Sequence, residues 1–141
     1  MKKKNTLLLF LCLFSLWAVA QENKPVKIAC VGNSITYGSG IKNQFQNSYP
    51  GLLSQLLGEG YDVRNFGISA RVLLNKGDHP YMHEQKFRDL LAFQPDIVTI
   101  KLGTNDSKPW NWRYGKDFKK DLTEMLDILQ ELPSKPKIYL C

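Results

Sequence analysis

The chain has 141 residues and a formal net charge of +6, to which a run of three lysines near its start contributes half. The rest has no basic stripe with interleaved aromatic side chains, so nothing supports nucleic-acid binding. The length fits one small domain, and three scattered cysteines do not make a disulfide framework.

Residues 1–20 have the three parts of a secretory signal peptide. Lysines precede an apolar run at 7–19, which closes on an Ala-Val-Ala site. This pattern predicts cleavage before Gln21 and a mature domain at 21–141. The protein is then expected to be secreted or periplasmic, without stable membrane insertion after cleavage. The apolar run is short for a membrane span, and an uncleaved anchor is the alternative.

The first predicted strand, at 27–31, stops at a glycine and presents a serine. Its apolar residues show no polar alternation, which is typical of a strand buried on both faces in a parallel sheet. Gly32 lets the backbone turn sharply, so Ser34 can stand at a strand-to-helix turn with its hydroxyl outward. That position suits a nucleophile, although a helix cap is the more common role of such a serine.

Helix and strand patterns alternate along the rest of the chain. Apolar residues recur at helical spacing in three stretches and form short uninterrupted runs in three others. In chain order these predict a helix at 49–57, a strand at 61–66, a helix at 81–93, a strand at 96–102, a helix at 117–132 and a strand at 137–141. The alternation predicts an α/β fold, with a parallel sheet covered by helices on both faces.

Three strand ends carry residues that suit an oxyanion hole. The first strand leads to Ser34, the second ends at Gly67, and a Gly-Thr-Asn-Asp segment with Asn105 follows the third. Because the carboxyl ends of parallel strands share one rim, these residues can converge. Two backbone amides and the Asn105 side chain would then stabilise a tetrahedral oxyanion, where losing one donor costs about 3 to 4 kcal/mol. Asp106 is expected to brace the loop.

These three motifs, in this order, resemble those of the SGNH (GDSL-type) hydrolase superfamily. Their residues are similar to those of its sialate O-acetylesterase-like branch. The resemblance covers residues 26–141, which is only part of the family's domain. It implies a flavodoxin-like three-layer fold, Ser34 as the nucleophile, and Gly67 and Asn105 as oxyanion-hole donors. It also implies an esterase without a cofactor that removes acyl groups, chiefly acetyl, from carbohydrates such as sialic acids or plant and host glycans.

Two features depart from the family's pattern. Asn33 stands where the family usually has aspartate, which removes a charge but keeps an acceptor. The family's Asp-x-x-His, which supplies the general base, has no match in this sequence. Because residues 137–141 look like a strand that is just beginning, we expect a C-terminally truncated chain that is inactive alone, from an active full-length protein.

The sequence contains two histidines, His79 and His83. Either could replace the missing base, with Asp78 orienting His79, but a solvated surface position is the more common fate of such residues. No metal site is expected, because two histidines and one aspartate lack a convincing third ligand.

Candidate substrate-binding residues follow the second and third strands. Trp110 and Trp112 could offer flat faces to sugar rings, or pack as a lid. Arg71 could pair with the carboxylate of an acidic sugar, or form a surface salt bridge. The expected partner is thus a small-molecule or glycan ester.

Three other functions are alternatives to a carbohydrate esterase. A lipase or lysophospholipase of the same family would need an apolar groove, whereas the loops here are polar. A non-catalytic carbohydrate-binding module would keep the aromatic residues without needing Ser34. A nucleotide-binding domain is disfavoured, because the glycines after the first strand match neither G-x-G-x-x-G nor a phosphate-binding G-K-[ST] loop.

Overall fold

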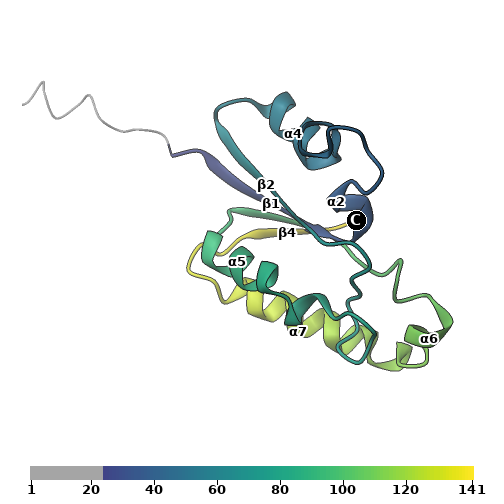
Figure 1. Cartoon of the computed structure of the whole chain (residues 1–141). Helices are drawn as coiled ribbons and strands as arrows, with labels where there is room; N and C mark the ends of the chain where they lie inside the picture. The colour runs from purple at the N-terminus through teal and green to yellow at the C-terminus, as the bar shows by residue number, and fades with distance from the viewer. Residues whose placement is uncertain (1–23) are drawn as a thin grey trace, which may run out of the picture.

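A computed structural model describes residues 24–141. The signal peptide predicted at 1–20 lies outside these described residues. The fold is built on one parallel sheet with strand order β2-β1-β3-β4 (Figure 1). The strands are β1 (Val26–Gly32), β2 (Tyr61–Gly67), β3 (Ile97–Lys101) and β4 (Lys137–Leu140). The predicted α/β fold with a parallel sheet is confirmed.

β1 lies in the middle of the sheet, between β2 and β3. Residues 29–31 are fully buried, as expected for an apolar run that packs on both faces. Gly32 pairs with Gly67 at the end of β2 and with Lys101 at the end of β3. The three strands therefore end level with one another, which places the loops that follow them along one rim.

Helices cover both faces of the sheet (Figure 1). On one side lie the short helix α2 and the helix α4, and on the other lie α5 and α7. Their bounds are α2 (Ser34–Tyr37), α4 (Tyr49–Leu57), α5 (Gln85–Phe93) and α7 (Phe118–Gln130). Two further single-turn helices are α3 (Gln44–Asn47), before α4, and α6 (Pro109–Trp112), before α7.

Two predicted helices begin later than expected. The stretch predicted as one helix at 81–93 starts with a 3-10 turn, η1 (Tyr81–His83), and α5 follows only after Glu84. The break arises because Glu84 is extended, with φ −81° and ψ 152°. A second 3-10 turn, η2 (Gly115–Asp117), precedes α7. The predicted helix at 49–57 is confirmed at both ends.

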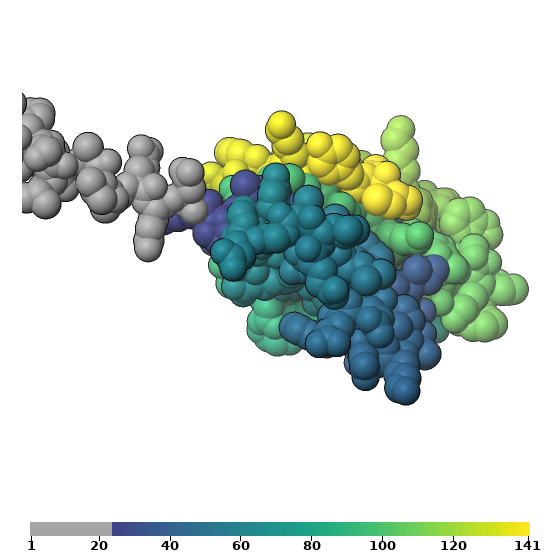
Figure 2. All heavy atoms as spheres, turned by 90° about the horizontal axis from the view of Figure 1, so that it is seen from above, coloured from purple at the N-terminus to yellow at the C-terminus, as the bar shows by residue number. Residues whose placement is uncertain are grey.

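The main core lies between the sheet and the α5/α7 side. There, buried residues of β1 and β3 pack against Leu90 and Phe93 of α5 and Met125 and Leu129 of α7. The α4 side is more open, and Tyr49 links α4 to the sheet through a 2.8 Å hydrogen bond between its hydroxyl and Thr99 Oγ1. β4 forms one edge, and its atoms lie along the border of the molecule in Figure 2.

None of the helices within residues 24–141 is both long enough and apolar enough to cross a bilayer.

Candidate active site

Ser34 is the first residue of α2, directly after the turn that ends β1. Asn33 caps this helix, because its Oδ1 accepts a 3.0 Å hydrogen bond from the Ile35 amide. Asn33 rather than Ser34 therefore caps α2, so the Ser34 hydroxyl is not used for capping. Ser34 is half-buried and its Oγ is not among the buried unpartnered atoms of the described residues, so it reaches solvent.

The turn before Ser34 requires a glycine. A Cβ added at Gly32 would lie 2.7 Å from the Lys101 carbonyl oxygen and closer still to Thr36 Oγ1. Only hydrogen at this position lets β1, the end of β3 and α2 approach so closely. Gly32 therefore fixes where α2 begins, and with it the place of Ser34 on the rim.

Gly67 lies against α2, but its amide is already engaged. The N–H donates a 2.9 Å hydrogen bond to the Asn65 side chain. Asn65 in turn donates from Nδ2 to the Thr36 carbonyl, at 3.0 Å, and so ties β2 to α2. The structure brings Gly67 beside the helix that Ser34 begins, yet it does not present the Gly67 amide as a free oxyanion donor.

Replacing Gly67 with alanine tests this packing role. A Cβ would press on the Tyr37 amide nitrogen and lie 2.8 Å from the Thr36 carbonyl carbon. We expect Gly67→Ala to lower the free energy of unfolding by about 1–3 kcal/mol, measured by urea denaturation. Gly60→Ala is the matched control, because a Cβ there meets nothing within 4 Å and no stability should be lost. Equal stability of the two variants would contradict the packing role.

Asn105 lies beside the loop that follows β2. Only 8% of it is exposed, and its Nδ2 donates a 3.0 Å hydrogen bond to the Arg71 carbonyl. A side-chain amide has two N–H hydrogens, so one is left for a ligand. In the same loop the Ser69 hydroxyl lies 2.6 Å from that of Ser39, which follows α2. These contacts connect the loops after β1, β2 and β3.

Ala70 is a backbone donor that the sequence did not reveal. Its φ of 67° lies in the left-handed region, which is uncommon for a residue other than glycine. Its amide has no hydrogen-bond partner within residues 24–141, and it precedes the residue whose carbonyl holds Asn105. Ala70 is therefore a second candidate, besides Gly67, for the backbone donor. No sequence signal marks it, since alanine has no preference for this conformation.

Buried polar side chains hold the loop after β2 in place. Asp106 is fully buried, and its Oδ1 accepts 2.8 Å hydrogen bonds from the amides of both Leu73 and Leu74. Farther along, Asp121 of α7 accepts a 2.8 Å bond from the Asn75 amide. The bracing role predicted for Asp106 is confirmed, and the loop after β2 is fixed by residues that follow β3.

The two histidines do not complete a catalytic group with Ser34. Both are exposed, and neither imidazole has a hydrogen-bond partner in the described part of the chain. His79 uses its carbonyl to accept from the Val72 amide, at 3.0 Å, and His83 uses its carbonyl to accept from Arg88. Within residues 24–141, no cluster of three histidine, cysteine or acidic side chains could hold a metal ion.

The three candidate substrate-binding residues differ in how they are held. The Arg71 guanidinium forms an ion pair with Glu84, with Nε 2.8 Å from Oε1, and donates to the Ser69 carbonyl at 3.0 Å. Trp110 and Trp112 of α6 are both about half exposed, at 52% and 54%. Of the two readings of Arg71, the structure therefore supports the salt bridge.

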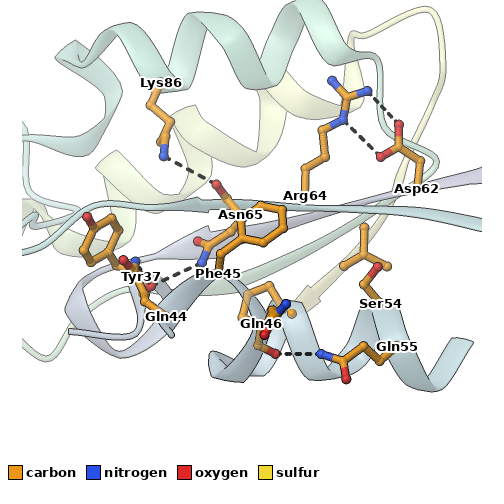
Figure 3. Close-up of a pocket in the computed structure, with 13 residues that line it drawn as sticks. Tyr37, Gln44, Phe45, Gln46, Ser54, Gln55, Asp62, Arg64, Asn65 and Lys86 are labelled. Carbon is orange, nitrogen blue, oxygen red and sulfur yellow. Dashed lines mark hydrogen bonds and ion pairs between the residues drawn. The ribbon is translucent and has the colours of Figure 1, made fainter. Parts of the chain in front are cut away.

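A cavity of about 850 Å³ lies beside β2, with side chains of α3 and α4 along its other side (Figure 3). It is open to solvent on one side, and its lining comes mainly from α3, α4 and β2 and includes Phe45, Arg64 and, from α5, Lys86. Ser34, Gly67 and Asn105 do not line it. The candidate active site is therefore the rim at the strand ends, and the cavity borders it through Asn65 and Tyr37, which both contact Gly67.

The chain resembles known esterases in sequence and in fold. A protein called acetylxylan esterase, from Xylanibacter ruminicola, is 48% identical over 139 residues. The match covers 86% of this chain but only 29% of that protein, so the chain spans less than a third of this relative's length.

Solved structures share the fold at low sequence identity. AlinE4, an esterase of the SGNH-hydrolase family, superimposes with a TM-score of 0.60 at 23% identity, covering 83% of this chain and 58% of AlinE4. Est24, a carbohydrate acetylesterase from Sinorhizobium meliloti, superimposes with a TM-score of 0.62 at 21% identity. The match covers 82% of this chain and 62% of Est24. The family model described as GDSL-like Lipase/Acylhydrolase matches residues 30–141. The chain belongs to the GDSL-like lipase/acylhydrolase family.

Proposed function

We propose that this chain carries the nucleophile and oxyanion-hole part of a serine esterase that removes acetyl groups from carbohydrates. The observation that carries the proposal is the rim itself. A solvent-accessible serine begins a helix, and Asn105, with one N–H to spare, is joined to the same rim through the loop contacts. The relative named acetylxylan esterase supports acetylated glycan as the substrate class.

In the proposed reaction, Ser34 Oγ attacks the carbonyl carbon of the acetyl ester. The carbonyl oxygen becomes negative, and three donors stabilise it: the Ser34 amide, Asn105 Nδ2, and the amide of Gly67 or Ala70. Use of Gly67 requires that its hydrogen bond to Asn65 be exchanged for the oxyanion, whereas Ala70 needs no such exchange. The geometry thus favours Ala70.

The bond from the carbonyl carbon to the sugar oxygen then breaks, and the sugar oxygen takes up a proton. Water attacks the acetyl-serine to release acetate and restore the hydroxyl. A general base must receive the Ser34 proton in the first step and return it to the sugar oxygen. Neither imidazole of the described residues contacts Ser34, so in this proposal the histidine of the family's Asp-x-x-His supplies the base in the full-length protein.

The pairing of Arg71 with Glu84 weakens the case for a sialic acid as substrate. Arg71 directly follows Ala70 in the sequence, and its guanidinium forms an ion pair with Glu84. A guanidinium already paired with a carboxylate has less charge to offer a sugar carboxylate. Sialate O-acetyl esters, the finer substrate suggested by the sequence wording, are therefore the less favoured acetylated sugars. Export of the protein stays a prediction.

Acetate release from defined substrates tests the proposal. We expect the full-length protein to release acetate from acetylated xylo-oligosaccharides with a kcat/KM at least about tenfold above that for an O-acetylated sialic acid, because each tenfold step needs only about 1.4 kcal/mol of preference in the transition state. Acetylated oligosaccharide incubated without protein controls for spontaneous hydrolysis. Absence of acetate release from both substrates would contradict the proposed function, and preference for the sialic acid would contradict the charge argument.

A further inference from the structure

Trp110 is an exposed aromatic side chain whose orientation is fixed. Its indole Nε1 donates a 3.1 Å hydrogen bond to Asp78 Oδ2, across from α6 to the loop after β2. About half of the residue remains exposed, and the Lys108 ammonium lies over one face of the ring, 5.6 Å from its centroid. The ring is therefore anchored along its edge, and part of its flat surface stays accessible next to polar hydrogen-bonding groups.

Trp112, in the same turn of helix, has a different environment. It packs against Phe118, with ring centroids 6.1 Å apart, and against Gly115, where an added Cβ would lie 2.8 Å from the indole. No hydrogen bond anchors its indole nitrogen within the described residues. Its exposed fraction is nearly that of Trp110, but it serves to pack the end of α6 against α7. Exposure alone therefore does not distinguish the two tryptophans, whereas their contacts do.

Asp78 connects Trp110 to the candidate oxyanion donor. Its other oxygen, Oδ1, accepts a 3.0 Å hydrogen bond from Asn111 Nδ2. The same Nδ2 group donates to the Asn105 carbonyl at 3.0 Å, and Asn111 is buried. Burial alone would raise the pKa of Asp78, but hydrogen bonds from Trp110 and Asn111 outweigh it and the pKa lies below its usual value. The carboxylate stays charged and keeps both contacts at neutral pH.

We propose that Trp110 is the platform of a sugar-binding subsite next to the reacting ester, and that Asp78 is the positioning residue that holds this platform in register with Asn105. The inference deepens the proposed function and rests on it. A pyranose ring has an apolar C–H face that suits an indole and a perimeter of hydroxyls. The Lys108 ammonium can donate to those hydroxyls.

Binding of an unacetylated sugar tests the subsite without any catalysis. Xylotetraose is titrated into the full-length protein by isothermal titration calorimetry. We expect Trp110→Ala to raise Kd at least about tenfold, because it removes the stacking face and 1.4 kcal/mol is one decade of affinity. Trp112→Ala is the matched control and should change Kd less than about twofold. Trp110→Phe keeps an aromatic face and should restore part of the affinity.

Asp78→Asn gives a second, independent readout. It keeps the size of the side chain but makes one of its two acceptors a donor, so either Trp110 or Asn111 loses its partner. For a positioning residue we expect a higher Kd for xylotetraose and, on acetylated xylo-oligosaccharide, a rise in KM that is larger than the fall in kcat.

The possible outcomes separate the subsite from the esterase activity. Tight binding of xylotetraose that depends on Trp110, with no acetate release from any ester, would leave the subsite intact and refute the esterase. Acetate release with no xylotetraose binding, with equal Kd values for the two alanine variants, or with Asp78→Asn binding unchanged, would overturn the subsite.

Discussion

Replacing Ser34 with alanine is expected to lower kcat for acetyl-ester hydrolysis by the full-length protein at least about 10³-fold. The hydroxyl is the only part of the proposed machinery that forms a bond to the substrate, and the oxyanion donors alone give a slow residual rate. Stability should stay the same, because Ser34 Oγ has no hydrogen-bond partner within residues 24–141 and Asn33 caps the helix. The measurements are 4-nitrophenyl acetate turnover and the thermal midpoint.

Ser39→Ala is the matched control for this experiment. Ser39 is a second exposed serine on the same rim, and its hydroxyl contacts that of Ser69. Its loss should change kcat less than about tenfold, since the contact only links two loops. A fluorophosphonate should label the wild type and the Ser39 variant but leave the Ser34 variant unlabelled. Labelling that persists in Ser34→Ala would assign the nucleophile to another residue.

Asp106→Ala should cause the largest loss of stability. The fully buried carboxylate accepts from the amides of Leu73 and Leu74, and alanine leaves both donors buried without a partner. Each unsatisfied buried donor costs about 1–3 kcal/mol, so the free energy of unfolding should fall by about 3 kcal/mol or more. This is a large part of the stability of an ordinary domain. Urea denaturation of the full-length protein measures the loss.

Two further variants make the Asp106 experiment specific. Asp106→Asn keeps one acceptor oxygen in the same place and should lose clearly less stability than the alanine variant. Asp127→Ala removes an exposed carboxylate of α7 that accepts no side-chain hydrogen bond in the described residues, and it should change stability by less than about 0.5 kcal/mol. If the alanine variants of Asp106 and Asp127 were equally stable, the carboxylate would not be bracing the loop.

The strands and long helices could be predicted because their patterns are strong. β1 contains an unbroken apolar run at 28–31, and α7 carries a regular apolar stripe, so burial determines both. The single-turn helices α3 and α6 were missed, because four residues are too few to show a helical period, whereas the start of α2 at Ser34 was predicted from the turn at Gly32. The turn that separates η1 from α5 depends on the backbone conformation of Glu84, which no local pattern marks.

The candidate site was predictable where it depends on topology and less so where it depends on side-chain contacts. Ser34 and Asn105 follow strands that end level in a parallel sheet, and their places on the rim follow from that. The engagement of the Gly67 amide by Asn65 was not predicted, although an asparagine side chain often accepts from the amide two residues later. The left-handed conformation of Ala70 depends instead on its loop being held by Asn105, which follows β3.

The bracing of the loop after β2 by Asp106 and Asp121 has a consequence for the order of folding. Leu73 and Asn75 are separated in sequence by 33 and 46 residues, respectively, from the carboxylates that their amides require. During synthesis on the ribosome, β1 and β2 can pair well before either acid has left the exit tunnel. The segment with Ser69 and Ala70 must therefore acquire its final shape late, so the proposed oxyanion hole forms after β1 and β2 have paired.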